Sequence, residues 1–414
     1  MDRKNFSEAL AKYAAVIVKV GLNLQPGQRL NLRADVEVAP LVRAIVKAAY
    51  QAGVYYVDVM WDDELTTHIR LQNASKESIS LFPNWRKDGM LEFMQANDAT
   101  LLVRAEYPDL FDDIGPEIVS IWRNSRFKHL QPAMELTRRN ELNWCGVASA
   151  SPAWAKKVFP DLSEEEALEK LWEAIFQSCR VDVNNPIEAW QKHIQDLAKR
   201  KDFLNAKHFT ALHYYGSGTN LTVGLPEQHL WTSAAMESKR GILFVGNLPT
   251  EEVFTMPHRE KVNGYVTATR PFSVPGSLIE NFTLTFENGS VVNAIARTGE
   301  ENLQRLLNTD EGARRLGEVA LVPHSSPVSQ RNHHFFSILY DENAASHMAL
   351  GSTYRFTMRG GTEMSDDEFQ ANGGNRSLIH MDFMIGSGEI NIDGIRNDGS
   401  QEPIMRAGEW AFDA

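Results

Sequence analysis

The stretch that determines the fold is residues 29–61, which read RLNLRADVEVAPLVRAIVKAAYQAGVYYVDVMW. Its first five residues, 29–33, alternate between apolar and polar side chains, as expected of a β-strand. Leu41, Ile45 and Ala48 then recur at helical spacing, and the segment stops at Gly53. Residues 55–61 are β-branched and aromatic, so they predict a second strand. This strand–helix–strand unit indicates a parallel sheet with helical crossovers.

The same rhythm continues on both sides of this unit. The patterns predict a helix over 6–22 that ends at Gly21, helices over 83–96 and 115–137, and a strand over 100–104. Residues 152–206 are rich in helical patterns and predict a connector with the apolar anchors Trp154, Leu168, Leu171, Trp172, Phe176, Trp190 and Ile194. We therefore expect residues 1–206 to form an α/β N-terminal domain with a mainly parallel sheet and a helical connector.

The pattern changes after residue 207. Strands are predicted over 208–215, 220–223, 265–270, 279–287 and 290–297. Asn288-Gly289 separates the last two and is a strong hairpin signal, because a type I′ turn needs positive φ at both central positions. Residues 207–414 are thus expected to form an α+β domain with an antiparallel sheet. Two domains agree with a length of 414 residues, which exceeds the roughly 250–300 residues of a single core.

Composition restricts the class of partner and the compartment. The formal net charge is -12 and no basic block occurs, which argues against nucleic acid and against an anionic membrane surface. Two cysteines, Cys145 and Cys179, form no disulfide framework and fit a reducing compartment. No signal peptide and no run of about 20 apolar residues is evident, so we expect a cytoplasmic protein.

No compact catalytic signature is present, so the chemistry must come from scattered residues. His-Glu-x-x-His, Gly-x-Ser-x-Gly, a phosphate-binding loop and Cys-x-x-Cys are all absent. The first candidate is His380-Met381-Asp382, because residues i and i+2 of a strand share one face. His380 and Asp382 would then project together, a pairing that suits a divalent metal. The alternative is a satisfied core histidine beside a surface aspartate.

Two acidic candidates precede it. Glu318 lies in an apolar segment and reads as a buried carboxylate, which is costly unless it is paired or binds a metal. An ion pair with Arg314 or Arg315 is the alternative. The adjacent Glu251 and Glu252 would point to opposite sides of an extended segment, so at most one is a direct ligand, and two solvated glutamates remain the alternative.

The last candidate segment contains Glu342, His347 and Tyr354 among small residues that allow close backbone approach. A phenol can ligate a metal or donate a hydrogen bond to a developing oxyanion. A helix with a polar face is the alternative for this segment.

Taken together, these segments resemble the metal-site motifs of the M29 family of metallo-aminopeptidases. The matching segments, in order and spacing, are residues 249–255, 316–323, 341–347 and 380–386, and the likeness also includes residues 154–160 in the first half. It covers nearly the whole chain and is closest to the aminopeptidase S group of Gram-positive bacteria within a family that also includes aminopeptidase T. The resemblance implies two divalent ions, zinc or cobalt with magnesium or manganese as alternatives, a homodimer, and the metal ligands Glu252, Glu318, Glu342, His347, Tyr354, His380 and Asp382.

The activity implied is removal of N-terminal residues from peptides with a free N-terminus, by a water that two metal ions activate. Glu318 is favoured as the bridging ligand, Glu342 as the base in preference to Glu251, and Tyr354 as the group that stabilises the oxyanion. Other dinuclear hydrolases, such as an amidase or a phosphoesterase, remain alternatives. A metal-stabilised binding protein without turnover is a further one, although closed structural zinc sites favour Cys and His ligands.

Overall fold

The computed structural model describes residues 3–216, 218–274 and 277–413 of the chain. It divides into two compact units, and neither is one continuous segment. Unit 1 comprises residues 1–194, 235–250 and 335–339, and unit 2 comprises residues 195–234, 251–334 and 340–414. The single domain boundary between residues 206 and 207 stays a prediction.

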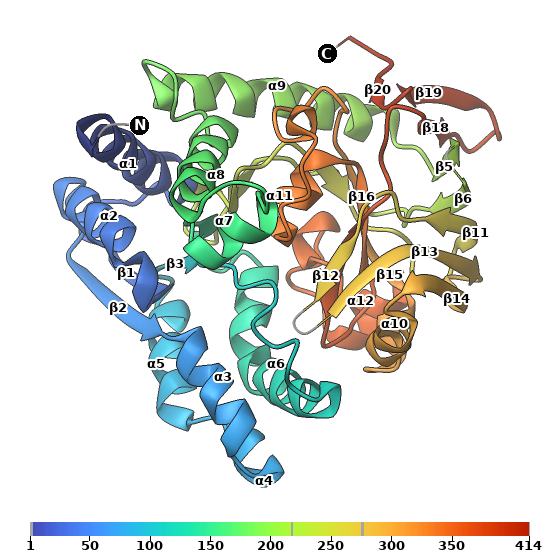
Figure 1. Ribbon diagram of the computed structural model, residues 1–414. Coiled ribbons are helices and arrows are strands. Elements are labelled where there is room, and N and C mark those ends of the chain that lie inside the picture. Colours follow the sequence, from blue (N-terminus) through green and yellow to red (C-terminus); the bar gives the residue numbers. More distant parts are fainter. Residues whose placement is uncertain (1–2, 217, 275–276, 414) are drawn as a thin grey trace. The chain divides into compact units, whose positions relative to one another are not determined.

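Unit 1 contains a parallel sheet with strand order β2-β1-β3-β4-β9 (Figure 1). The strands are β1 (Arg29–Asp35), β2 (Tyr56–Asp62), β3 (Ala99–Arg104), β4 (Trp144–Ala148) and β9 (Asn247–Leu248). The expected α/β architecture with a mainly parallel sheet is confirmed. A separate antiparallel pair in the same unit is formed by β7 (Ala235–Glu237) and β8 (Leu243–Val245).

The helices of unit 1 follow the strands in the expected order. They are α1 (Arg3–Val16), the π-helical turn η1 (Ile17–Gly21), η2 (Val36–Val38), α2 (Ala39–Gln51), α3 (Glu64–Asn73), α4 (Lys76–Ile79), α5 (Asn84–Gln95), α6 (Pro116–Arg138), α7 (Pro152–Val158) and α8 (Glu164–Ser178). Helix α2 buries Leu41, Val42 and Ile45 on one face. It ends before Gly53, whose φ of +87° is a conformation that side chains disfavour, so the residue stops the helix as the sequence predicts.

Helix α9 (Pro186–Lys207) belongs to both units, since the division falls after Ile194. Of the apolar anchors expected in the helical connector, Trp154, Leu171 and Trp190 are fully buried. Phe176 is also buried, whereas Leu168, Trp172 and Ile194 are only partly buried. The connector is therefore helical, as predicted.

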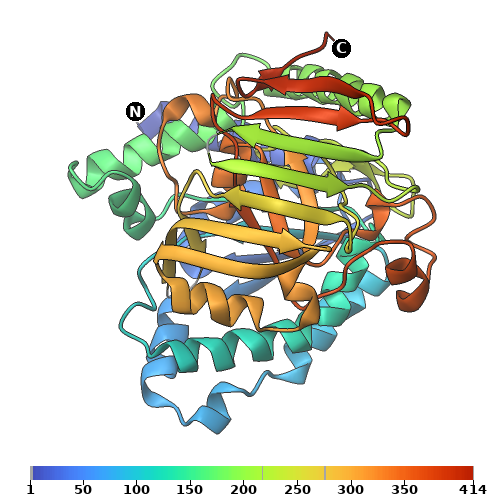
Figure 2. The same cartoon turned by 90° about the vertical axis from the view of Figure 1, so that its right-hand side faces the viewer.

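Unit 2 contains a large antiparallel sheet with strand order β12-β13-β11-β6-β5-β18-β19-β20, and β14 pairs with β13 (Figure 2). The strands are β5 (Ala211–Gly216), β6 (Thr219–Gly224), β11 (Val262–Thr267), β12 (Phe272–Val274), β13 (Ser277–Glu287), β14 (Ser290–Thr298), β18 (Asn391–Ile395), β19 (Gln401–Arg406) and β20 (Glu409–Trp410). The hairpin between β13 and β14 turns at Asn288 (φ 49°) and Gly289 (φ 80°), so the predicted turn with two positive φ angles is present.

A second antiparallel sheet in unit 2, here named the ligand sheet, has the order β10-β15-β16-β17. Its strands are β10 (Val253–Thr255), β15 (Leu316–Leu321), β16 (His347–Gly351) and β17 (His380–Met384). The remaining short helices are α10 (Glu300–Leu307), η3 (Glu311–Arg314), η4 (Ser329–Arg331), α11 (Ile338–Asp341), η5 (Glu342–Ala344), η6 (Arg355–Thr357) and α12 (Asp366–Ala371).

Two strand boundaries differ from the sequence prediction. Strand β5 begins at Ala211 and not at residue 208, because α9 continues to Lys207 and His208 has a φ of 49°. Strand β11 covers residues 262–267 and not 265–270. Its register is fixed by pairing of Val262 with Val223 on β6, a contact that local sequence patterns do not reveal.

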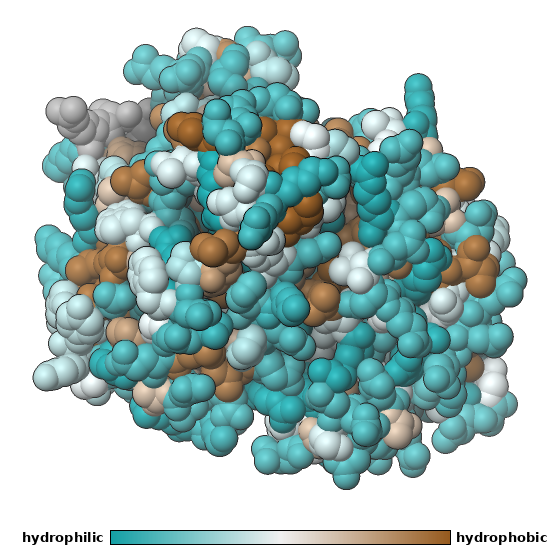
Figure 3. Space-filling view, turned by 90° about the horizontal axis from the view of Figure 1, so that it is seen from below, coloured by the Kyte–Doolittle hydropathy of each residue, from teal (hydrophilic) through white to brown (hydrophobic). Residues whose placement is uncertain are grey.

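In the part of the chain that the structure describes, no helix is long and apolar enough to cross a membrane. On the face shown in Figure 3, hydrophobic side chains lie between hydrophilic ones.

Candidate metal centre

The ligand sheet brings four of the predicted residues onto one face. Glu318 on β15 is in register with Ala349 on β16, and Ala349 is in register with Asp382 on β17. On the same pair of strands, His347 of β16 is in register with Ala320 of β15, which lies two residues after Glu318. Because side chains two residues apart share a face, Glu318, His347, Asp382 and His380 all project from the same side. The prediction that His380 and Asp382 share a face of a strand is confirmed.

The ligand atoms of these residues form two overlapping groups. Glu252, Glu318 and His347 offer atoms that lie within 4.8 Å of one another, and so do Glu318, His380 and Asp382. In the first group, His347 Nε2 lies 3.0 Å from Glu252 Oε2 and 3.7 Å from Glu318 Oε1. In the second, His380 Nε2 lies 3.4 Å from Glu318 Oε2 and 3.6 Å from Asp382 Oδ1. Glu318 is common to both, and each of its oxygens faces a different imidazole.

Backbone carbonyls orient both imidazoles. His347 Nδ1 lies 3.1 Å from Ala345 O, and His380 Nδ1 lies 2.6 Å from Ser352 O. A carbonyl can only accept, so each Nδ1 carries the proton of this hydrogen bond and Nε2 is turned towards the carboxylates. Such a partner on the far nitrogen is typical of metal-binding histidines.

A tight backbone turn supplies the carbonyl that orients His380. Gly351 ends β16 with a φ of +106°, and a Cβ at this position would lie 2.3 Å from Ile379 O. Only glycine fits here. The next residue, Ser352, donates its backbone N–H to Ile379 O and accepts from His380.

The electrostatics of the cluster fit divalent cations. Burial raises the pKa of Glu252 and of Asp382 above their ordinary values. Burial would also raise the pKa of Glu318, but the interactions with the nearby imidazoles of His347 and His380 outweigh it and lower this pKa to about 2. If the Nε2 atoms are unprotonated, their lone pairs face the carboxylate oxygens and repel them. A cation bound between the nitrogen and the oxygens would remove this repulsion.

Two buried carboxylate oxygens show whether the donor set fits a cation. Asp382 Oδ1 is buried and has no hydrogen-bond donor in the described parts of the chain. Glu252 Oε2 is likewise buried and lies near His347 Nε2 without hydrogen-bond geometry. A buried carboxylate without donors is costly unless it binds a metal, so the donor set fits the metal ions that the sequence predicts.

The remaining predicted residues lie in the segments that flank β16. Glu342 begins η5 and is buried, and burial together with the charges of Asp382 and Glu252 raises its pKa well above the ordinary value. The ring of Tyr354 packs edge-on against His380, with ring centroids 4.8 Å apart. The backbone N–H of Glu251 donates to Asn343 Oδ1 at 2.6 Å.

Three alternative interpretations are wrong. Glu318 faces two histidines, whereas the guanidinium of Arg315 donates to Arg259 O and Asn288 O. Glu251 and Glu252 are both buried and not solvated. The segment containing His347 is a short 3-10 turn followed by a buried strand, and not a helix with a polar face.

The sequence prediction missed Ala349. This residue lies in register between Glu318 and Asp382, and its single methyl group leaves the space above the sheet open between two carboxylates. An alanine flanked by apolar residues gives no functional signal of its own. Only the strand register, which is set by pairing across the sheet, identifies it.

An α/β unit, together with a sheet that gathers buried carboxylates and imidazoles, defines the class as a metal-binding hydrolase. The profile of the family described as thermophilic metalloprotease (M29) matches residues 6–410. Aminopeptidase 2 of Geobacillus stearothermophilus is 46% identical over 408 residues, which cover 99% of this chain and 99% of that protein. Aminopeptidase AmpS of Bacillus subtilis (strain 168) is 44% identical and covers 99% of this chain and 100% of its own length.

The structure agrees with a solved relative. Wild-type AmpT from Thermus thermophilus superposes with a TM-score of 0.91 at 43% sequence identity, covering 98% of this chain and 100% of that chain. The chain belongs to the M29 metalloprotease family. It is therefore a metal-dependent enzyme that hydrolyses peptide bonds, as the sequence motifs predict.

Proposed function

We propose that this protein is an aminopeptidase that removes N-terminal residues from peptides by using two divalent cations. The names of its relatives support the exopeptidase assignment. The observation that carries the two-cation assignment is Glu318, whose two oxygens face His347 and His380 in two separate ligand groups. A carboxylate shared in this way suits a bridge between two ions.

The proposed ligands divide between the two ions. Glu252 and His347 would hold one, His380 and Asp382 the other, and Glu318 would contribute to both. Glu342 and Tyr354 complete the proposed set, and neither belongs to the two compact groups. Imidazole ligands favour zinc or cobalt over magnesium, which prefers oxygen donors, although magnesium and manganese stay open.

Bound cations would supply a Lewis acid for the scissile carbonyl and lower the pKa of the attacking water. The carboxylate of Glu342 would take the proton of that water and pass it to the leaving amine nitrogen. The hydroxyl of Tyr354 would donate to the oxyanion of the tetrahedral intermediate. A free substrate α-amine would bind at the second cation, which explains a preference for unblocked N-termini.

The family likeness also supports a homodimer, which light scattering on the purified protein tests. Buried Cys145 and Cys179 support a reducing, cytoplasmic location.

The decisive experiment compares turnover of free-amine and N-acetylated aminoacyl anilides before and after chelation. We expect hydrolysis of the free-amine substrates only, loss on chelation, and recovery when a divalent metal is added. Glu318→Ala should lose both metal and activity, whereas the exposed Glu311→Ala serves as the matched control. Efficient cleavage of acetylated substrates would refute the exopeptidase assignment, and full activity of Glu318→Ala would refute the bridging role.

A further inference from the structure

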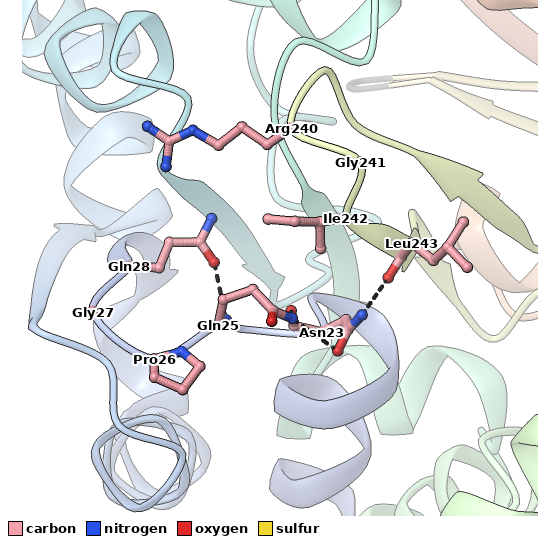
Figure 4. A pocket seen from close by; sticks show the side chains of 9 residues that line it. All are labelled: Asn23, Gln25, Pro26, Gly27, Gln28, Arg240, Gly241, Ile242 and Leu243. Atoms are coloured by element: carbon pink, nitrogen blue, oxygen red, sulfur yellow. Dashed lines mark hydrogen bonds between the residues drawn. The ribbon is translucent and has the colours of Figure 1, made fainter.

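The larger of two hollows in the described part of unit 1 has polar groups around it that are bound by other groups of the protein. This hollow, of about 650 Å³, lies between the segment 23–28 and the segment 240–243 (Figure 4). Asn23 donates to Leu243 O at 2.8 Å, and Gln28 Oε1 accepts from the backbone N–H of Gln25. Arg240 donates to Ala96 O at 2.6 Å. The groups that could hold a ligand are thus already engaged by the protein.

The second hollow, here named the edge cavity, has a volume of about 450 Å³. It lies at the carboxyl ends of β1 and β2, where Val36 and Asp62 line it. Ligands of open parallel sheets bind outside the carboxyl ends of the strands, and the edge cavity lies at such ends.

Most charged groups in the edge cavity have protein partners. Asp62 pairs with Arg33 at 3.3 Å and with Arg86 at 2.9 Å. Asp63 caps α3 by accepting from the backbone N–H groups of Leu65 and Thr66. Arg70 donates to the backbone carbonyls of Ser78 and Leu81. None of these groups is left to bind a ligand.

Glu64 and Arg126 are the exceptions. Glu64 Oε2 is buried and has no hydrogen-bond partner among the residues that the structure describes. In the described residues, Arg126 makes neither an ion pair nor a hydrogen bond, and its guanidinium lies 5.4 Å from the ring centroid of Trp122. Burial raises the pKa of Glu64, and the positive charge of Arg126 opposes that rise. The cavity therefore offers a carboxylate oxygen and a guanidinium that no hydrogen bond or ion pair of the described residues engages.

We propose that the edge cavity binds a free α-amino acid with a large apolar side chain. Glu64 would accept from the ammonium group and Arg126 would donate to the carboxylate, as guanidinium groups commonly do. Trp61, Trp122 and Phe82 line the cavity and supply aromatic walls for the side chain. A volume of about 450 Å³ lies within the range of small-molecule sites. The edge cavity shares no residue with the candidate metal centre, and the proposed aminopeptidase reaction would release ligands of this class.

Hydrogen–deuterium exchange measured by mass spectrometry on the metal-loaded protein tests the proposal, with L-phenylalanine as the probe. We expect protection in residues 61–70 and 119–128. 3-Phenylpropionate lacks the ammonium group and phenethylamine lacks the carboxylate, so each should bind at least tenfold more weakly. Glu64→Gln and Arg126→Gln should each weaken phenylalanine binding at least tenfold. Glu117→Gln, an exposed residue of α6 that pairs with Lys76, is the matched control and should bind as the wild type does.

Three outcomes would overturn the proposal. Protection confined to residues 316–321 and 380–384 would mean that phenylalanine binds only at the metal centre. Equal affinity for phenylalanine and phenylpropionate would mean that the ammonium group is not recognised. Unchanged binding in a folded Glu64→Gln or Arg126→Gln protein would exclude the assigned partners. The exchange readout needs no turnover, so failure of the aminopeptidase assignment would be seen separately in the activity assay.

Discussion

Removal of the metal should make the stability of the protein depend on pH through His380. Burial alone would lower the pKa of this imidazole, but the carboxylates of Asp382 and Glu318 outweigh burial and raise it to about 9. The ordinary value in an unfolded chain is about 6.5. A group with a raised pKa stabilises the fold fully below the unfolded value, and this contribution is lost as pH rises through the folded value.

The difference between about 6.5 and about 9 corresponds to about 3 kcal/mol of unfolding free energy, since one pKa unit is worth about 1.4 kcal/mol. Metal-free protein should therefore lose about this much stability between pH 6.5 and pH 9 through His380. His347 also has a raised pKa, because the carboxylates of Glu252 and Glu318 outweigh its burial. Its contribution to stability is therefore also lost as the pH rises.

Urea unfolding of chelator-treated protein at several pH values between 6 and 9 measures the effect. His380→Gln is the control, because glutamine does not titrate and keeps a polar side chain of similar size. The difference in pH dependence between the wild type and His380→Gln separates the contribution of His380 from that of His347. Metal-loaded protein should show the opposite trend, because cations bind the unprotonated imidazole and gain affinity as pH rises. An equal pH dependence in metal-free wild type and His380→Gln would refute the reasoning.

Three further predictions concern single residues. Ala349→Leu should place carbon atoms between Glu318 and Asp382, lower the metal content after dialysis severalfold and cost about 1–3 kcal/mol of stability. Met348→Leu, on the opposite face of the sheet, should leave the metal content unchanged. Equal metal content in both variants would contradict the register argument. Asp382→Asn keeps the shape of the side chain but removes its charge, so metal affinity should fall by at least about tenfold in a competition assay with a chelator. An unchanged affinity would remove this residue from the ligand set. Buried Cys145 and Cys179 should tolerate replacement by Ser without loss of turnover per bound metal, and an inactive variant with normal metal content would instead indicate a thiol mechanism.

The parts of the fold that the sequence predicted are those with a local signal. The segment 29–61 contains a strand pattern, a helical pattern and a second strand pattern, and β1, α2 and β2 follow them closely. The shared face of His380 and Asp382 also depends only on the two-residue period of a strand. In both cases the backbone geometry of a single segment was enough.

The parts that the sequence could not predict depend on contacts between distant segments. Small residues around His347 fit a helix or a strand equally well, and pairing of β16 with β15 and β17 decides between them. The same pairing places Ala349 between two carboxylates. Glu318 has two arginines as sequence neighbours, yet the sheet directs it towards histidines more than 25 residues away in sequence.

The face of the ligand sheet opposite the polar cluster is apolar. This face carries Val319, Met348 and Phe383, which are in register across three strands and fully buried. Their packing fixes the strand register through apolar contacts, which do not depend on the charge state of the other face. That register alone aligns Glu318, Ala349 and Asp382. The apolar side of the sheet therefore sets the alignment of the strands that carry the candidate ligands. Substitutions on the apolar face should then disturb metal binding only when they change the register.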